Sequence, residues 1–197
     1  MKQEEKHKLA IFVSGNGSNA EEIMKYFMNH PKIEVALLLT NNSKAYAIER
    51  AKKFAVPCKV FTKQDIEEET VVEWLQSAGV SHCVLAGYLW LIPESLLKAY
   101  PDKIINIHPA LLPKYGGKGM YGMKVHEAIR ANNETLTGIT IHLVNTKYDE
   151  GKILAQETVD VSPTDSPEDI ANKVHALEHA YYPKVIEAWV VNLKFEI

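Results

Sequence analysis

The chain has 197 residues, of which 46% are hydrophobic and 24% are charged, a composition typical of one soluble globular domain. Its net charge of −3 gives no support for a nucleic-acid partner, and no apolar run approaches the roughly 20 residues needed to cross a membrane. The two cysteines, Cys58 and Cys83, lie in apolar surroundings, so we expect buried, reduced thiols in a cytoplasmic protein.

Short apolar runs alternate with amphipathic segments along the chain, after a charged stretch over residues 1–8 that we expect to be a loosely ordered tail without a signal peptide. Strands are predicted over residues 9–13, 33–40, 58–61, 82–86, 103–107, 138–144 and 152–161. Helices are predicted over residues 19–29, 44–55, 65–77, 94–100, 124–131 and 167–191. This order predicts a single α/β domain over residues 1–197, with helices on both faces of a mostly parallel sheet. The last two strands have a short connection, which permits an antiparallel pair and a mixed C-terminal part.

A glycine-rich loop follows the first predicted strand. Gly15, Gly17 and Ala20 match the G-x-G-x-x-G/A spacing that lets backbone amides and a helix N-terminus receive a phosphate. A dinucleotide site would also need a carboxylate after the second strand, where this chain has Thr40 followed by two asparagines. The loop therefore favours a small phosphate ester over NAD, and a tight structural turn is the alternative.

Residues 85–93 form an apolar segment at the end of another predicted strand. In open α/β sheets, ligands bind outside the carboxyl ends of the strands, so a flat heteroaromatic ring could lie here. By composition alone, a place in the hydrophobic core is the alternative interpretation.

Asn106 and His108 lie in an apolar run that ends at a proline. Alternate residues of an extended segment share a face, so these two side chains should point the same way. An amide that donates a hydrogen bond and an imidazole that moves protons suit a carbonyl whose oxygen becomes negative during a reaction. Asp149, in the loop between the last two strands, can supply the carboxylate that usually completes such a set. A structural histidine is the alternative. His142, in a later predicted strand, could support a catalytic side chain, but we favour a structural role.

The last predicted helix contains His175, Glu178 and His179, which match the H-x-x-E-H pattern of some zinc enzymes. Two histidines four residues apart lie on one face of a helix and could bind a metal. No third ligand is identifiable in the sequence, so we interpret the group as a polar stripe and predict no metal site.

Taken in order, these motifs resemble the folate-dependent formyltransferases, and the Gly-Asn-Gly-Ser-Asn loop narrows the resemblance to the phosphoribosylglycinamide formyltransferase (glycinamide ribonucleotide transformylase) branch. The resemblance extends from residue 9 to about residue 189 and is carried by residues 14–19, 85–88, 106–109, 111–115, 149–151 and 178–183. It implies a Rossmann-like formyltransferase fold. It also implies transfer of a formyl group from 10-formyltetrahydrofolate, the co-substrate, to the amine of glycinamide ribonucleotide in de novo purine biosynthesis.

The resemblance also implies roles for individual residues. Gly17, Ser18 and Asn19 would hold the substrate phosphate, and Glu178 would accept hydrogen bonds from the ribose hydroxyls. Asn106 and a protonated His108 would stabilise the oxyanion, while Asp149 would favour the imidazolium and help to order water. Folate would contact, largely through backbone groups, Leu89, Trp90, Leu91, Ile92, Asn106, Asn145, Thr146, Lys147, Tyr148 and Asp149.

The chain departs from the family pattern at two places. Trp90 stands where an arginine is frequent, and residues 116–122 replace a Pro-Gly-x-His sequence with a segment containing four glycines. Four glycines so close together suggest a mobile lid near the substrate.

Related activities remain as alternatives. Methionyl-tRNA formyltransferases would need a further C-terminal domain and a basic surface, and formyltetrahydrofolate deformylases an N-terminal regulatory domain. Sugar-nucleotide N-formyltransferases share the Asn/His/Asp set. Only the loop after the first predicted strand (residues 14–19, the phosphate loop), where we expect a small phosphate ester, argues against them. A zinc hydrolase and a non-catalytic phosphate-binding module are the alternatives from other functional classes.

Overall fold

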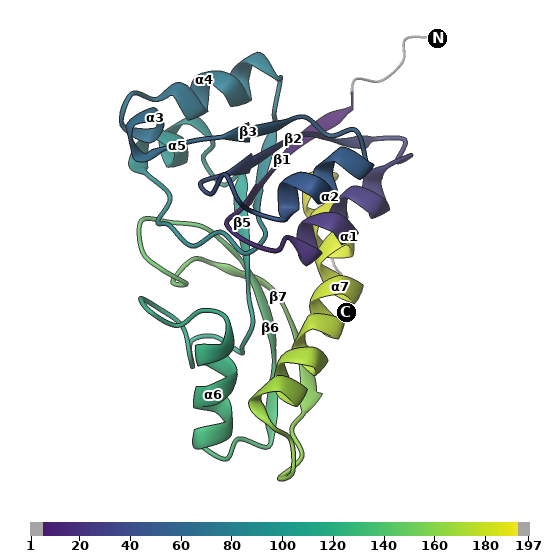
Figure 1. Ribbon diagram of the computed structural model, residues 1–197, viewed down its shortest axis with the longest axis vertical. Coiled ribbons are helices and arrows are strands. Elements are labelled where there is room, and N and C mark those ends of the chain that lie inside the picture. Colours follow the sequence, from purple (N-terminus) through teal and green to yellow (C-terminus); the bar gives the residue numbers. More distant parts are fainter. Residues whose placement is uncertain (1–5, 193–197) are drawn as a thin grey trace.

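A computed structural model describes residues 6–192, which form one sheet flanked by helices (Figure 1). The strands are β1 (His7–Val13), β2 (Ile33–Thr40), β3 (Cys58–Val60), β4 (His82–Leu85), β5 (Ile104–His108), β6 (Leu136–Leu143) and β7 (Ile153–Asp160). The helices are α1 (Ser18–Phe27), α2 (Ala47–Lys53), α3 (Lys63–Glu67), α4 (Thr70–Ser77), α5 (Glu94–Ala99), α6 (Met123–Ala131) and α7 (Pro167–Val190).

The strand order in the sheet is β3-β2-β1-β4-β5-β6-β7. β3, β2, β1, β4 and β5 pair in parallel, whereas β6 is antiparallel to both β5 and β7. The chain moves outward from β1 to β3 and then returns to the other side of β1 with β4. This reversal places a topological switch point between β1 and β4, where ligands of open α/β sheets bind. The predicted mixed α/β sheet is confirmed.

Helices cover both faces of the sheet, as the alternation of buried residues along β1 requires. Leu9, Ile11 and Val13 pack into the cluster formed with α1, α2, α6 and α7, while Ala10 and Phe12 pack into the cluster formed with α4 and α5. In Figure 1, α1 lies against the long helix α7, and α3, α4 and α5 gather on the other side of the N-terminal strands. Strands buried on both faces read as continuous apolar runs, which is the pattern of β1 and β4.

The structure corrects the predicted tail and one predicted helix, whereas the ends of the other elements differ from the prediction by at most three residues. β1 begins at His7 and pairs with β2 from its first residue, so the predicted tail is wrong for residues 7 and 8; residues 1–5 lie outside the described part of the chain. The predicted helix over residues 65–77 is two helices. Thr62 begins α3 with a capping box, and Glu69 adopts a positive φ of 59° that ends one helix and begins the next.

The sequence predicts two buried, reduced thiols and no segment that crosses a membrane. Cys83 is fully buried as expected, whereas Cys58 is only partly buried, and both are unpaired. Across residues 6–192, each helix is too short or too polar to span a bilayer.

His82 on β4 is held as a neutral imidazole by its partners. The Lys103 ammonium lies 3.2 Å from Nε2 and can only donate, so Nε2 accepts and Nδ1–H donates to Ser81 Oγ at 2.9 Å. Burial, followed by the charges of Lys103 and His7, lowers the pKa of His82 to about 4. Burial likewise lowers the pKa of His126 on α6 to about 4.

We predict that acid destabilises this protein between about pH 6.5 and pH 4. Both groups have a folded pKa below the unfolded value of 6.5, so their contribution to stability is present above pH 6.5 and is lost as the pH falls toward 4. A shift of this size corresponds to about 3 kcal/mol per histidine. Urea unfolding at pH 7.5 and pH 4.5 measures the loss. His82→Gln, which retains a donor and an acceptor, should make the loss smaller; an unchanged pH dependence in this variant would contradict the assignment.

Candidate functional site

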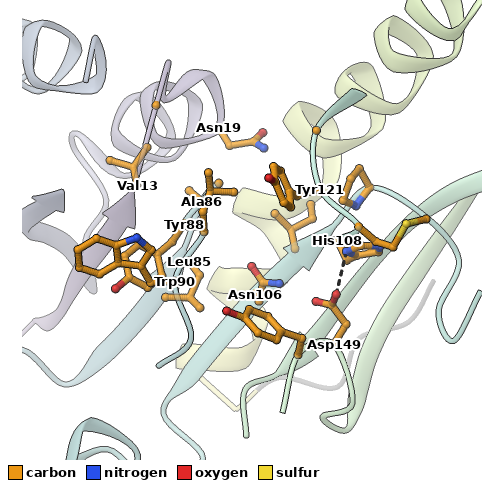
Figure 2. A pocket seen from close by; sticks show the side chains of 18 of the residues that line it. Val13, Asn19, Leu85, Ala86, Tyr88, Trp90, Asn106, His108, Tyr121 and Asp149 are labelled. Carbon is orange, nitrogen blue, oxygen red and sulfur yellow. Dashed lines mark ion pairs between the residues drawn. The ribbon is translucent and has the colours of Figure 1, made fainter. Parts of the chain in front are cut away.

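A cavity of about 670 Å³ opens at the carboxyl ends of β1, β4 and β5, at the topological switch point. Its walls come from the loop after β1, the segment after β4, the end of β5, residues 117–122 and 147–149, and α7. This volume is in the usual range for a small-molecule site. Figure 2 shows Trp90 and Tyr88 toward one end of the cavity and the His108–Asp149 pair toward the other.

The loop after β1 presents the start of α1 to the cavity. Gly17 is the N-cap residue with a φ of 74°, and no side chain caps the helix. The first N–H groups of a helix lack intrahelical partners, so those of Ser18 and Asn19 remain available to an anion. Only glycine fits at position 17, because a Cβ there would lie 2.6 Å from Ala47 Cβ and 3.0 Å from Ala47 Cα. The loop therefore has the geometry expected of a phosphate site.

Glu178 on α7 lies beside this loop and lines the same cavity. Its Oε2 accepts a hydrogen bond from Asn19 Nδ2 at 2.9 Å, and its side chain is buried. Burial raises the pKa of the Glu178 carboxyl, an effect that the Asn19 hydrogen bond partly offsets. Asn19 Oδ1 is buried without a hydrogen-bond partner in residues 6–192. Two oxygen acceptors therefore meet beside the loop after β1, where hydroxyl groups of a ligand could donate to both.

Asn106 and His108 share a face of β5, as the alternation predicted. Each pairs with a residue of β6, Asn106 with His142 and His108 with Thr140. His142 Nδ1 lies 2.8 Å from the Leu143 carbonyl, which can only accept, so Nδ1 carries a proton. In the neutral ring, Nε2 then accepts from Asn106 Nδ2 at 3.2 Å. This contact orients the amide and leaves its second N–H free to donate.

Asp149 lies between the two imidazoles. Oδ2 is 3.4 Å from His108 Nδ1, Oδ1 is 3.6 Å from His142 Nε2, and Oδ2 also accepts from the Gly117 backbone N–H at 2.9 Å. Burial raises the pKa of Asp149, but His142, the charge of His108 and the Gly117 hydrogen bond together lower it below its usual range. Asp149 is therefore a carboxylate at neutral pH, and the structure brings Asn106, His108 and Asp149 together at one end of the cavity.

His108 is bound by a backbone carbonyl, and burial shifts its pKa. Its Nε2–H donates to the Tyr115 carbonyl at 2.8 Å. Burial lowers the pKa of His108 below 6.5, and the opposing effects of Asp149 and the Tyr115 carbonyl only partly offset it. Desolvation thus outweighs the nearby carboxylate and favours the neutral imidazole in the unliganded protein, and the protonated His108 expected at the oxyanion during the reaction stays a prediction. The imidazole begins neutral, with Nδ1 as its basic nitrogen.

The apolar segment after β4 lines the cavity as predicted. All four residues from Leu89 to Ile92 border it. The Leu89 N–H donates to Ser14 Oγ at 3.1 Å, which connects the segment to the loop after β1. Folate contacts were also predicted for residues 145–149, of which Lys147, Tyr148 and Asp149 border the cavity. Asn145 and Thr146 do not, and the Asn145 side chain accepts from Lys147 N within its own turn. For these two residues the cavity gives the predicted contact no support.

Several cavity residues were not singled out from the sequence. No sequence motif distinguishes His126, yet it lines the cavity. Its Nδ1 is buried without a hydrogen-bond partner in the described chain. For His142 we favoured a structural role over a supporting one, and the register of β5 on β6 places it in contact with Asn106, as the supporting role requires. The segment of residues 116–122, with its four glycines, also lines the cavity through Lys118, Met120 and Tyr121. The sequence signalled this loop only through its glycines.

The helix motif of α7 does not assemble a metal site in this geometry. His175 and His179 stack with ring centroids 6.5 Å apart, and His175 Nε2 lies 4.0 Å from Glu178 Oε2. In residues 6–192, no three His, Cys, Asp or Glu side chains are arranged to hold a metal ion. Glu178 is directed at Asn19, so α7 supplies the cavity with a hydrogen-bonding carboxylate.

Comparison with known proteins assigns the chain to a family. The family model for formyl transferases matches residues 7–186. A phosphoribosylglycinamide formyltransferase of Bacillus subtilis is 39% identical over 91% of this chain and 93% of its own length. Chloroplastic phosphoribosylglycinamide formyltransferases of Arabidopsis thaliana and Vigna unguiculata are 43% and 42% identical over 92% of this chain, which spans 64% and 60% of their lengths. A solved phosphoribosylglycinamide formyltransferase of Bacillus halodurans superposes with a TM-score of 0.84 at 35% identity, over 96% of this chain and all of that one.

Proposed function

The chain belongs to the formyl transferase family, and on that premise we propose that it transfers a formyl group from 10-formyltetrahydrofolate to the amine of glycinamide ribonucleotide. The reaction would serve de novo purine biosynthesis. One observation carries the proposal: the cavity joins an uncapped helix N-terminus at Gly17 to the Asn106, His108 and Asp149 set. An acceptor substrate with a phosphate at one end and an amine at the other fits both.

The substrate would be oriented by the residues around the start of α1. The N–H groups of Ser18 and Asn19 would hold its phosphate, and the ribose hydroxyls would donate to Glu178 and to Asn19 Oδ1, which is otherwise unpartnered in the described chain. The pterin would lie against the Leu89–Ile92 segment and the segment of Tyr148, which border the same cavity. The formyl carbon would then meet the amine beside Asn106.

In the first step, the amine nitrogen attacks the formyl carbon, and the carbonyl oxygen becomes an oxyanion. The free N–H of Asn106 donates to that oxygen, which stabilises the charge as it develops. The attacking nitrogen becomes positive and gives up a proton, which His108 takes at Nδ1. Asp149 stabilises the resulting imidazolium from 3.4 Å.

In the second step, the bond between the formyl carbon and the folate nitrogen breaks. The oxyanion re-forms a carbonyl, and the proton held by His108 is delivered to the departing nitrogen. The products are formylglycinamide ribonucleotide and tetrahydrofolate, and His108 returns to its neutral state. A neutral imidazole in the unliganded protein suits this cycle, because it must first accept a proton and later return it.

A panel of acceptors tests the proposal. Purified protein with 10-formyltetrahydrofolate is given glycinamide ribonucleotide, an amino-sugar nucleotide, methionyl-tRNA or water alone, and tetrahydrofolate release is followed. We expect turnover with glycinamide ribonucleotide to exceed that with every other acceptor by at least about 100-fold. A faster reaction with the amino-sugar nucleotide would assign the chain to sugar N-formyl transfer, and equal folate turnover without any acceptor would indicate a deformylase.

A further inference from the structure

Arg50 on α2 binds the phosphate loop, at Asn16, from outside the cavity. Its Nε donates to the Asn16 carbonyl at 2.9 Å, and its Nη2 donates to Asn16 Oδ1 at 3.0 Å. Asn16 lies between Gly15 and Gly17 and lines the cavity, whereas Arg50 does not. The guanidinium therefore holds both oxygens of this residue toward α2 and away from the place of the anion.

The guanidinium is itself fixed by its surroundings. Its Nη1 pairs with Glu21 in the first turn of α1, and its Cζ lies 5.0 Å from the centre of the Tyr46 ring. The Arg50 side chain is only 17% exposed. Lys53 pairs with the same Glu21 at 3.1 Å but makes no contact with Asn16 among the described hydrogen bonds. Two cations of one helix thus share a carboxylate, and one of them also holds the loop.

We propose that Arg50 is a positioning residue that keeps the phosphate loop in its anion-binding conformation and so sets the affinity for the phosphate of the substrate. A loop with glycine on either side of Asn16 has many alternative conformations, and a carbonyl turned toward the anion would repel it. The planar fork of Arg50 binds the Asn16 carbonyl and side chain together, which removes those alternatives. Lys53 carries the same charge beside Glu21 without contacting Asn16, so the effect assigned to Arg50 alone is the one that comes through loop geometry. This inference rests on the proposed function, which places a phosphate at this loop.

The test compares Arg50→Met with the matched variant Lys53→Met. Loss of two charge-assisted hydrogen bonds should raise the KM for glycinamide ribonucleotide at least about tenfold in Arg50→Met. The KM for 10-formyltetrahydrofolate should be unchanged, and kcat should stay within about threefold. Lys53→Met should keep all three constants near those of the wild type. Arg50→Lys should behave like Arg50→Met, since an ammonium cannot reproduce the fork.

The substrate without its phosphate separates positioning from general damage. Glycinamide riboside should be formylated slowly, and equally well by wild type and Arg50→Met. A proportional loss with the riboside, or an unchanged KM for the ribonucleotide in both Arg50 variants, would overturn the proposal. If Arg50→Met does not fold, Arg50→Lys decides by the same comparison.

Calorimetric titration with ribose 5-phosphate separates this inference from the proposed function, because it needs no turnover. Wild type and Lys53→Met should bind the probe, and Arg50→Met should bind it at least about tenfold more weakly. If wild type forms no formyl product but this difference is present, the role of Arg50 stands and the proposed reaction falls. If formyl transfer is present but the three proteins bind the probe equally, the role of Arg50 falls alone.

Discussion

Replacing Asp149 with asparagine is expected to lower kcat for formyl transfer by roughly 100- to 1000-fold. Asp149 is the carboxylate between His108 and His142, and it accepts the Gly117 N–H. An asparagine keeps an oxygen for Gly117, so the loop remains in place, but it removes the charge that stabilises the His108 imidazolium. The proton of the attacking amine then has no stable acceptor.

Steady-state kinetics with both substrates saturating measures this effect, with the melting temperature as a check on folding. Glu150→Gln is the matched control, because Glu150 is the next residue and pairs with Lys147 at 3.0 Å on the exposed side of the same loop. It should keep kcat within about twofold, as expected for an exposed ion pair. An Asp149→Asn enzyme with unimpaired kcat would remove Asp149 from the mechanism.

Replacing Asn106 with alanine should lower kcat about 100-fold or more, a loss of a few kcal/mol in transition-state stabilisation. The structural reason is the orientation of its amide, which donates one N–H to His142 Nε2 and leaves the other for the oxyanion. The ground-state carbonyl gains less from this donor than the oxyanion does, so the KM values should change much less than kcat.

Asn145→Ala is the control for this variant. Asn145 belongs to the loop that also carries Asp149, but its side chain is bound within its own turn and does not border the cavity. It should keep kcat within about threefold. If Asn106→Ala raised only the KM for folate and left kcat intact, Asn106 would be a binding residue without a part in the chemistry.

Local patterns in the sequence were enough to predict the fold class and to single out many of the residues that line the cavity. The apolar runs located the strands along the chain. The period of two along β5 placed Asn106 and His108 on one face. The glycine spacing after β1 located the start of α1. These features depend on residues close together in the chain, so their patterns can be read without knowing which strands are neighbours.

Contacts between distant segments could not be predicted in this way. His142 meets Asn106 because of the register between β5 and β6, and no periodicity within either strand specifies that register. Arg50 meets Asn16 because α2 packs on the loop after β1, across 34 residues of chain. The division between α3 and α4 depends on the positive φ of Glu69, a residue type that does not favour it. The protonation state of His108 depends on burial, which only the folded structure determines.

The most direct test follows the formyl carbon itself. Wild-type protein is incubated with 10-formyltetrahydrofolate carrying carbon-13 in the formyl group and with glycinamide ribonucleotide, and the label is followed by NMR. We predict that the label appears on the amine nitrogen of the ribonucleotide, in equal amount to the tetrahydrofolate formed. Label that stayed on the folate, or that appeared as free formate, would contradict the proposed reaction.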